Sequence, residues 1–291
     1  MVRWVSPPQS SPFVIALGIL TAMSGCTQRV GQAALLHARV EPRPPMSDAV
    51  SQVNIDLALT DGTTLRGWLL SRPGSRQDVL FFYDNASTML DTMSTLYAFS
   101  DALDADVFAF DYRGYGFSDG VPSLRSMVED ALPEYEFVRA RAAGAERPVV
   151  VIGEALGTAS AARVASVRPV RSLILMSPFS SFGDLVAAVG RAKHGCKIVP
   201  DESLARVDLS PEIDLRAVTA PTLFVHGKGD ELATPEMIRK VDTACRSSAK
   251  QECAVDGGRG DVRPENPSVR QCVARFDRDV SGAAASPPPV R

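Results

Sequence analysis

The sequence lacks several features that would define its class at once. No internal apolar run approaches the roughly 18–20 residues of a membrane-spanning helix, which excludes a protein with several spans. Five cysteines in 291 residues are too few for a disulfide scaffold. Basic residues (31) and acidic residues (34) nearly balance, so no footprint for nucleic acid is expected. Cysteine and histidine show no zinc-binding spacing, and neither a metal nor a cofactor is predicted.

What remains is the composition of an ordinary globular chain, with 45% hydrophobic and 22% charged residues. This excludes low-complexity disorder, collagen and coiled coil as descriptions of the whole chain. The length would permit two domains. Because both ends are predicted to lie outside the fold, residues 49–278 are expected to form one domain.

The first 25 residues have the layout of a secretory signal. Arg3 precedes a short apolar core at residues 13–20, and small residues precede Cys26. Residues 20–26 also resemble a bacterial lipobox, although Met23 stands where Leu is more usual. That resemblance implies cleavage before Cys26 and a lipid on its side chain, with ordinary signal cleavage as the alternative. We therefore expect an exported protein, anchored by its N-terminal lipid on the periplasmic side of the cell envelope.

Two segments read as unfolded flanks. Residues 26–48 contain three prolines and are predicted to be a lipidated tether, and residues 279–291 end in alanine and proline runs and are predicted to be a disordered tail.

Export would place the four remaining cysteines in an oxidising space, where three pairings are open. Cys245 closes a predicted helix and Cys253 lies on the next predicted strand, so this pair is sterically easy. Cys196 and Cys272 would then form the second bridge. The alternative is that the four are buried free thiols.

Strand and helix patterns alternate along the folded part. Residues 52–59 and 64–71 flank an Asp-Gly turn and predict a β-hairpin. Such alternation predicts an α/β fold, with a mostly parallel sheet covered by helices on both faces. Residues 180–211 interrupt it and are predicted to form a short lid. Further strands are expected at 79–83, 107–110, 148–152, 173–176, 222–225 and 252–255, and helices at 88–103, 124–142, 156–166, 182–192, 235–246 and 267–276.

Five loops in order resemble those of the α/β-hydrolase superfamily, in particular its small exported or membrane-associated serine hydrolases. They lie at residues 111–120, 153–157, 177–181, 226–230 and 257–261, with the spacing usual in the family. The resemblance covers roughly residues 52–277 and implies the α/β-hydrolase fold.

The resemblance also assigns the positions of a catalytic triad, and two of the three are altered. The strand-to-helix elbow, which reads G-x-S-x-G in the family, has Ala155 at its centre, and a methyl group cannot attack a carbonyl. Arg259 falls where the family has its histidine base, and a guanidinium cannot take up a proton. Asp230 retains the acid position. An ion pair between Arg259 and Asp230 is predicted, because the carboxylate would otherwise lack a partner.

The loop that helps to form the family's oxyanion hole differs too. It usually carries a His-Gly pair, and here it reads Tyr83, Asp84 and Asn85, with Leu156 after the elbow centre. A carboxylate that points inward would destabilise a developing oxyanion. Other side chains that could substitute for the lost groups are less favoured. They are Ser87, Ser118, Ser160, His37, His194 and His226, of which His226 is expected to be structural.

Three functions are compatible with these residues. The favoured one is a non-catalytic lipoprotein that binds a small ligand or a partner protein in the former active-site cleft. The second is an active esterase, lipase or thioesterase with non-standard catalytic groups. The third is a structural envelope protein that uses only its outer surface.

Overall fold

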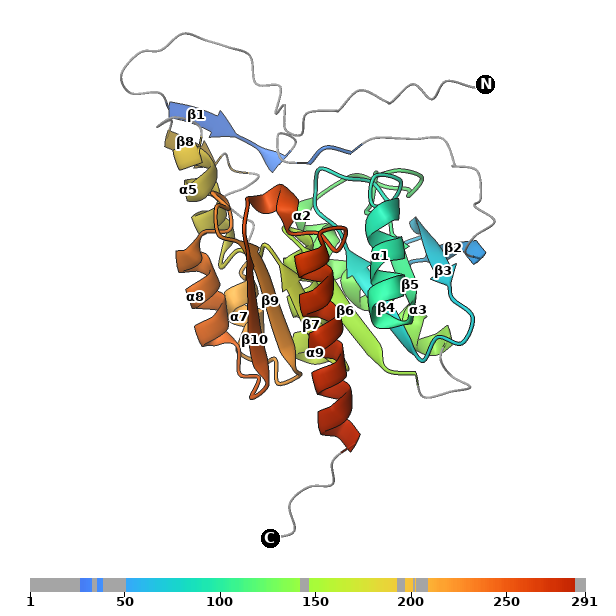
Figure 1. Ribbon diagram of the computed structural model, residues 1–291. Coiled ribbons are helices and arrows are strands. Elements are labelled where there is room, and N and C mark those ends of the chain that lie inside the picture. Colours follow the sequence, from blue (N-terminus) through green and yellow to red (C-terminus); the bar gives the residue numbers. More distant parts are fainter. Residues whose placement is uncertain are drawn as a thin grey trace, which may run out of the picture.

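A computed structural model describes residues 27–32, 36–38, 51–141, 147–192, 197–200, 202 and 209–285 (Figure 1). The predicted signal segment, the lipid site at Cys26, and both His194 and Cys196 lie outside these residues. Across the described part of the chain, no helix is long and apolar enough to cross a membrane.

The core of the fold is an eight-stranded sheet in the order β10-β9-β7-β6-β4-β5-β3-β2. The last two strands form the predicted hairpin, β2 (Ser51–Ala58) with β3 (Thr64–Ser71), and β3 pairs antiparallel with β5. All other pairs are parallel, which confirms the predicted fold class. The parallel strands are β4 (Gln77–Phe82), β5 (Ala105–Phe110), β6 (Val149–Glu154), β7 (Ser172–Met176), β9 (Thr222–Gly227) and β10 (Lys250–Val255).

Helices pack on the sheet in two groups, one against each face (Figure 1). The first group is α1 (Met93–Leu103) and α9 (Pro267–Ala285). The second group is α2 (Leu124–Glu129), α3 (Ala131–Arg141), α4 (Gly157–Val167), α7 (Pro211–Leu215) and α8 (Pro235–Ala244). Because the sheet is covered on both sides, β4, β5, β6, β7 and β9 are buried along their whole length.

The predicted helix over residues 124–142 is two helices, α2 and α3, which meet at Asp130. Pro133 lies in the first turn of α3. A residue there needs no intrahelical N–H donor, so the chain restarts the helix at this point instead of kinking it.

The described residues of both predicted flanks include regular secondary structure. In the predicted tether, β1 (Thr27–Val30) pairs in parallel with β8 (Lys197–Pro200) of the predicted lid, which also contains α5 (Phe182–Ala192). Leu36 is buried, and the His37 N–H donates to the carbonyl oxygen of Asn85 at 3.3 Å. At the other end, α9 runs to Ala285, because the alanines of the predicted tail are strong helix formers.

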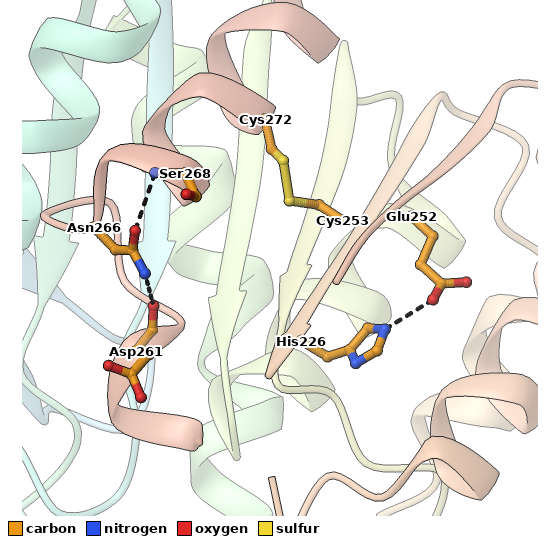
Figure 2. The surroundings of a disulfide bond; sticks show 7 residues. All are labelled: His226, Glu252, Cys253, Asp261, Asn266, Ser268 and Cys272. Atoms are coloured by element: carbon orange, nitrogen blue, oxygen red, sulfur yellow. Dashed lines mark hydrogen bonds and ion pairs between the residues drawn. A yellow bond between two sulfur atoms is a disulfide. The ribbon is translucent and has the colours of Figure 1, made fainter. Parts of the chain in front are cut away.

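The predicted disulfide pairing is wrong. Cys253 on β10 is bonded to Cys272 on α9, and Cys245 is a buried free thiol (Figure 2). The reason is the alternation of side chains along a strand. Cys253 points to the face covered by α9, whereas Cys245 ends α8 on the opposite face, where its thiol contacts Thr222.

Replacing both Cys253 and Cys272 by alanine is expected to lower the free energy of unfolding by about 2–4 kcal/mol. The bridge closes a loop with a sequence separation of 19, and removing such a constraint stabilises the unfolded chain by this order. Urea unfolding measures the change, and dithiothreitol added to the unaltered protein should reproduce it. Equal stability of the oxidised protein and the variant would contradict the role given to this bridge.

Candidate functional site

The loop between β6 and α4 retains the sharp turn of a nucleophile elbow. Ala155 has a φ of 52°, in the left-handed region that a non-glycine residue rarely adopts. The turn packs so closely that a Cβ on Gly157 would lie 2.2 Å from the Phe82 carbonyl oxygen, and one on Gly153 would lie 2.6 Å from the Gly157 carbonyl oxygen. These two glycines therefore hold a strained backbone around Ala155.

Ala155 itself is buried at the carboxyl edge of the sheet, with its backbone N–H donating to the Met176 carbonyl oxygen at 2.9 Å. The side chain at the centre of the elbow is a methyl group, which carries neither a lone pair nor an ionisable proton. The backbone geometry of a nucleophile is thus present without the nucleophile.

Asp230 lies in the loop after β9 and is 5% exposed. Its Oδ1 accepts hydrogen bonds from the backbone N–H groups of Leu232 and Ala233, both at 2.9 Å. Its Oδ2 is buried and has no hydrogen-bond partner among the described residues. One oxygen of the retained acid is therefore fixed by the backbone, and the other is left unsatisfied.

Arg259 pairs with a different carboxylate from the one predicted. Its Nη2 lies 3.6 Å from Oδ2 of Asp84, which is 3% exposed. The predicted ion pair between Arg259 and Asp230 is wrong, because the buried charge of Asp84 attracts the guanidinium, whereas backbone N–H groups already hold Asp230. The positive charge of Arg259 thus faces the negative charge of Asp84 in the loop after β4.

A second buried carboxylate is also paired with a partly exposed arginine. Nε of Arg263 lies 3.0 Å from Oε1 of Glu154, the residue before Ala155. Burial, and then the nearby charge of Asp84, raise the pKa of Glu154 to about 7, although Arg263 and Arg259 oppose the shift. Sequence reasoning missed this pair. The available signal was a lone carboxylate at the end of a continuous apolar strand, which calls for a cationic partner.

The remaining residues of the oxyanion region are held by the loops around them. The Tyr83 hydroxyl donates to Oδ1 of Asp111 at 2.8 Å, and burial raises the pKa of Tyr83 well above its usual range. The Asn85 carbonyl oxygen accepts hydrogen bonds from Tyr115 and from the His37 N–H. Leu156 is buried at the start of α4. The Tyr83 hydroxyl is thus committed to Asp111.

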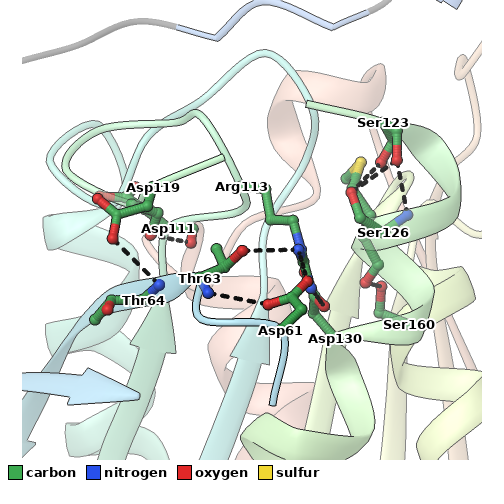
Figure 3. A network of polar contacts seen from close by, with 12 residues as sticks. Asp61, Thr63, Thr64, Asp111, Arg113, Asp119, Ser123, Ser126, Asp130 and Ser160 are labelled. Atoms are coloured by element: carbon green, nitrogen blue, oxygen red, sulfur yellow. Dashed lines mark hydrogen bonds and ion pairs between the residues drawn. The ribbon is translucent and has the colours of Figure 1, made fainter. Parts of the chain in front are cut away.

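The loop over residues 111–120, one of the five that resemble the family, is anchored by Arg113 (Figure 3). Its guanidinium binds Asp130 in bidentate fashion, at 2.7 and 2.8 Å, and also binds Asp61 and Thr63 in the β2–β3 turn. The bond from Arg113 lowers the pKa of Asp61 to about 2. These contacts give the loop a structural role.

The serines proposed as substitutes have structural partners where their contacts are given. The Ser118 hydroxyl donates to the Asp111 carbonyl oxygen, and the Ser160 hydroxyl donates to that of Met127. Ser87 lies buried in the loop after β4. The His226 ring lies 2.8 Å from Glu252 (Figure 2). In the described ranges of the chain, no histidine ring is paired with a serine hydroxyl.

No group of three or more His, Cys, Asp or Glu side chains in the described ranges could hold a metal ion. At the carboxyl ends of β4, β6 and β9 lie three buried carboxylates, Asp84, Glu154 and Asp230, and two of them are paired with partly exposed arginines. At the positions that the resemblance assigns to the nucleophile and the base, the side chains are the methyl group of Ala155 and the guanidinium of Arg259.

Residues 91–215 match the family described as "Serine aminopeptidase, S33". The chain is 26% identical over 217 residues to the alpha/beta hydrolase domain-containing protein aho-3 of Caenorhabditis elegans. This match covers 74% of this chain and 62% of that protein. It is 29% identical over 203 residues to protein bem46 of Schizosaccharomyces pombe, covering 68% and 67%. It is 30% identical over 161 residues to the alpha/beta hydrolase domain-containing protein 17C of Homo sapiens, and the match covers 55% of this chain and 46% of that protein. Several matches thus span less than two thirds of the relative.

Solved structures agree with the fold. The Pyrococcus furiosus esterase Pf2001 superposes with a TM-score of 0.69 at 16% identity, covering 84% of this chain and 96% of that chain. The alpha/beta hydrolase domain-containing protein 10 from mouse superposes with a TM-score of 0.59 at 18% identity, covering 79% of this chain and 99% of that chain. The protein therefore has the α/β-hydrolase fold, and the sequence matches support its place in the α/β-hydrolase superfamily.

Proposed function

We propose that this protein is a non-catalytic α/β-hydrolase-fold lipoprotein that binds a small ligand or a partner at the former active-site edge. One observation carries the proposal. A methyl group occupies the intact elbow, and the arginine at the base position is paired with Asp84. Loss of the serine or the histidine of a triad costs about 10⁶ in kcat.

Unsatisfied acceptors support a binding role for this edge. Buried oxygens without a partner among the described residues follow three neighbouring strands: Oε2 of Glu154, Oγ of Ser177 and Oδ2 of Asp230. Ser177 also has a positive φ, of 47°. Buried acceptors without partners cost about 1–3 kcal/mol each. These oxygens are closed to solvent, so a ligand rich in N–H donors, such as a short peptide, would relieve that cost by displacing the loops that cover them.

L-Alanyl p-nitroanilide tests both parts of the proposal, since it carries an ammonium group, an amide N–H and a chromogenic leaving group. It is expected to raise the melting temperature of the full chain in a saturable manner, while nitroaniline is released no faster than in buffer. Asp230→Asn should weaken binding at least fivefold, because it removes the charge of an unsatisfied acceptor. Asp256→Asn, at an exposed carboxylate beside Lys228, is the matched control.

Saturable release of nitroaniline, lost on mutation of one serine, would instead establish a hydrolase with non-standard groups. The match to a family named for a serine aminopeptidase favours this second candidate. If the compound is neither bound nor hydrolysed, the proposed role of the edge is refuted, and the outer surface is left as the functional part.

The lipid anchor belongs to the same proposal. Cys26→Ser is expected to move the protein from the membrane pellet to the soluble fraction, because several acyl chains anchor a protein stably whereas the bare chain has no such attachment. Detergent phase partitioning of cell fractions measures this. Cys245→Ala, at a buried free thiol, should leave the protein in the membrane fraction. Retention of the Cys26 variant in the pellet would exclude the lipid anchor.

A further inference from the structure

The first described residues of the chain lie across the carboxyl edge of the sheet. Residues 27–32 and 36–38 form a segment that we call the N-terminal strap. It begins with β1, which lies beside the lid strand β8 above the main sheet (Figure 1). The composition of this region predicts only a tether, whereas its contacts join loops that surround the elbow.

The strap is attached to three different connections of the fold. At one end, β1 pairs in parallel with β8 of the lid, which connects β7 to β9. At the other end, the His37 N–H donates to the Asn85 carbonyl oxygen at 3.3 Å, in the loop after β4. Between them, Oε1 of Gln32 accepts a hydrogen bond at 3.1 Å from the N–H of Leu124, at the start of α2 in the connection from β5 to β6.

The strand order shows what lies beneath the strap. In the sheet, β6 stands between β7 and β4. A segment that runs from the lid after β7 to the loop after β4 therefore crosses the carboxyl end of β6, where Ala155 forms the centre of the elbow. Ala155 is 3% exposed, and Asp84, the neighbour of the strap contact Asn85, is also 3% exposed. The strap thus belongs to the cover of the former active-site edge.

The strap is fastened by few groups. Among its described residues, Leu36 has the only buried side chain. Strands β1 and β8 have four residues each and form a two-stranded sheet separate from the main one, and such a pair is marginal in water by itself. A segment held by one leucine, a short ladder and hydrogen bonds to two loops opens at a lower free energy than the core does. The strap can therefore detach while the sheet stays folded.

We propose that the N-terminal strap is an autoinhibitory segment, which closes the former active-site edge and has to detach before a ligand can enter. Leu36 is its apolar anchor, and its contacts with Asn85 and Leu124 hold the neighbouring loops in the closed arrangement. While the strap is in place, the unsatisfied oxygens of Glu154 and Asp230 stay out of reach of a ligand. The autoinhibitory role rests on the proposed function, since it concerns the same edge, whereas the closure itself does not.

A thiol placed at the elbow centre measures the closure without any ligand. In an Ala155→Cys background, adding Leu36→Asp is expected to raise the rate of iodoacetamide modification at position 155 at least about tenfold. Burial of a leucine side chain is worth at least that factor in an opening equilibrium, and a carboxylate is costly to return to the apolar site. Peptide mapping by mass spectrometry gives the rate at each thiol.

Two controls and a milder variant accompany this measurement. Val121→Asp, at a side chain 79% exposed in the loop after β5, introduces the same group at the same edge and should leave the rate unchanged. The buried free thiol of Cys245 reports on the rest of the fold and should stay equally slow in every variant. Gln32→Ala removes only the acceptor of the Leu124 N–H and should raise the rate about threefold.

Equal rates at position 155 with and without Leu36→Asp would overturn the closure. A parallel rise at Cys245 would overturn it too, because the change would then act by general unfolding. L-Alanyl p-nitroanilide separates the strap from the binding role, and Leu36→Asp alone should bind it at least fivefold more tightly than the unaltered protein. Equal affinity would overturn the autoinhibitory role. If the rate at position 155 rises and neither protein binds the compound, the closure stands and the proposed function is refuted.

Discussion

Combining Ala155→Ser with Arg259→His is expected to leave ester hydrolysis within about tenfold of the buffer rate. The double change supplies a nucleophile at the elbow and an imidazole at the position that the resemblance assigns to the base. It also removes the guanidinium that faces Asp84. The freed carboxylate, 3% exposed in the oxyanion loop, would then oppose the negative charge that develops in the transition state.

The triple variant that adds Asp84→Gly should hydrolyse p-nitrophenyl butyrate at least about 100-fold faster than the double variant, since a single oxyanion-hole contact is worth about 10²–10³ in kcat. Initial rates over a substrate series measure the difference, and Asp84→Gly alone should stay inactive. Strong recovery in the double variant would show that the loop is still competent with Asp84 in place.

The contribution of Glu154 to the free energy of unfolding is expected to fall by about 3 kcal/mol as the pH rises from about 4.5 to about 7. The pKa of this buried carboxyl is raised from 4.5 to about 7 in the folded protein. Between these values the folded state holds a proton that the unfolded state has released. The stabilisation is therefore complete below the lower value and lost as the pH passes the upper one.

Urea unfolding at several pH values, compared between the unaltered protein and Glu154→Gln, isolates this contribution. In Glu154→Gln the free energy of unfolding should no longer fall between about pH 4.5 and about pH 7. In Glu231→Gln, at an exposed carboxylate, it should still fall. Parallel pH profiles for the unaltered protein and Glu154→Gln would mean that Arg263 keeps Glu154 ionised throughout.

Patterns local in the sequence predicted the fold well. Continuous apolar runs gave the buried strands, the Asp61-Gly62 turn gave the hairpin, and the loop signatures gave their order. The elbow was also predictable, because its glycines are required by contacts that depend on the turn itself. In the structure Ala155 follows β6 and Asp230 follows β9, at the carboxyl ends of these two strands.

Pairings between distant segments could not be predicted in this way. Arg263 and Glu154 are 109 residues apart, and nothing in the spacing of either reveals the other. The Cys253–Cys272 bridge depends on which face of β10 each side chain occupies, and the nearness of Cys245 in sequence was misleading. The partner of Arg259 was decided by a competition between two buried carboxylates, which requires the environment of both.

The pairing of β1 with β8 has a consequence for orientation. β1 begins at Thr27, directly after Cys26, and the His37 N–H contacts the loop that follows β4. If Cys26 carries lipid as proposed, the acyl chains emerge on the side of the lid. The protein would then hold its binding edge against the bilayer surface, and its ligands would arrive along the headgroups instead of from the open periplasm.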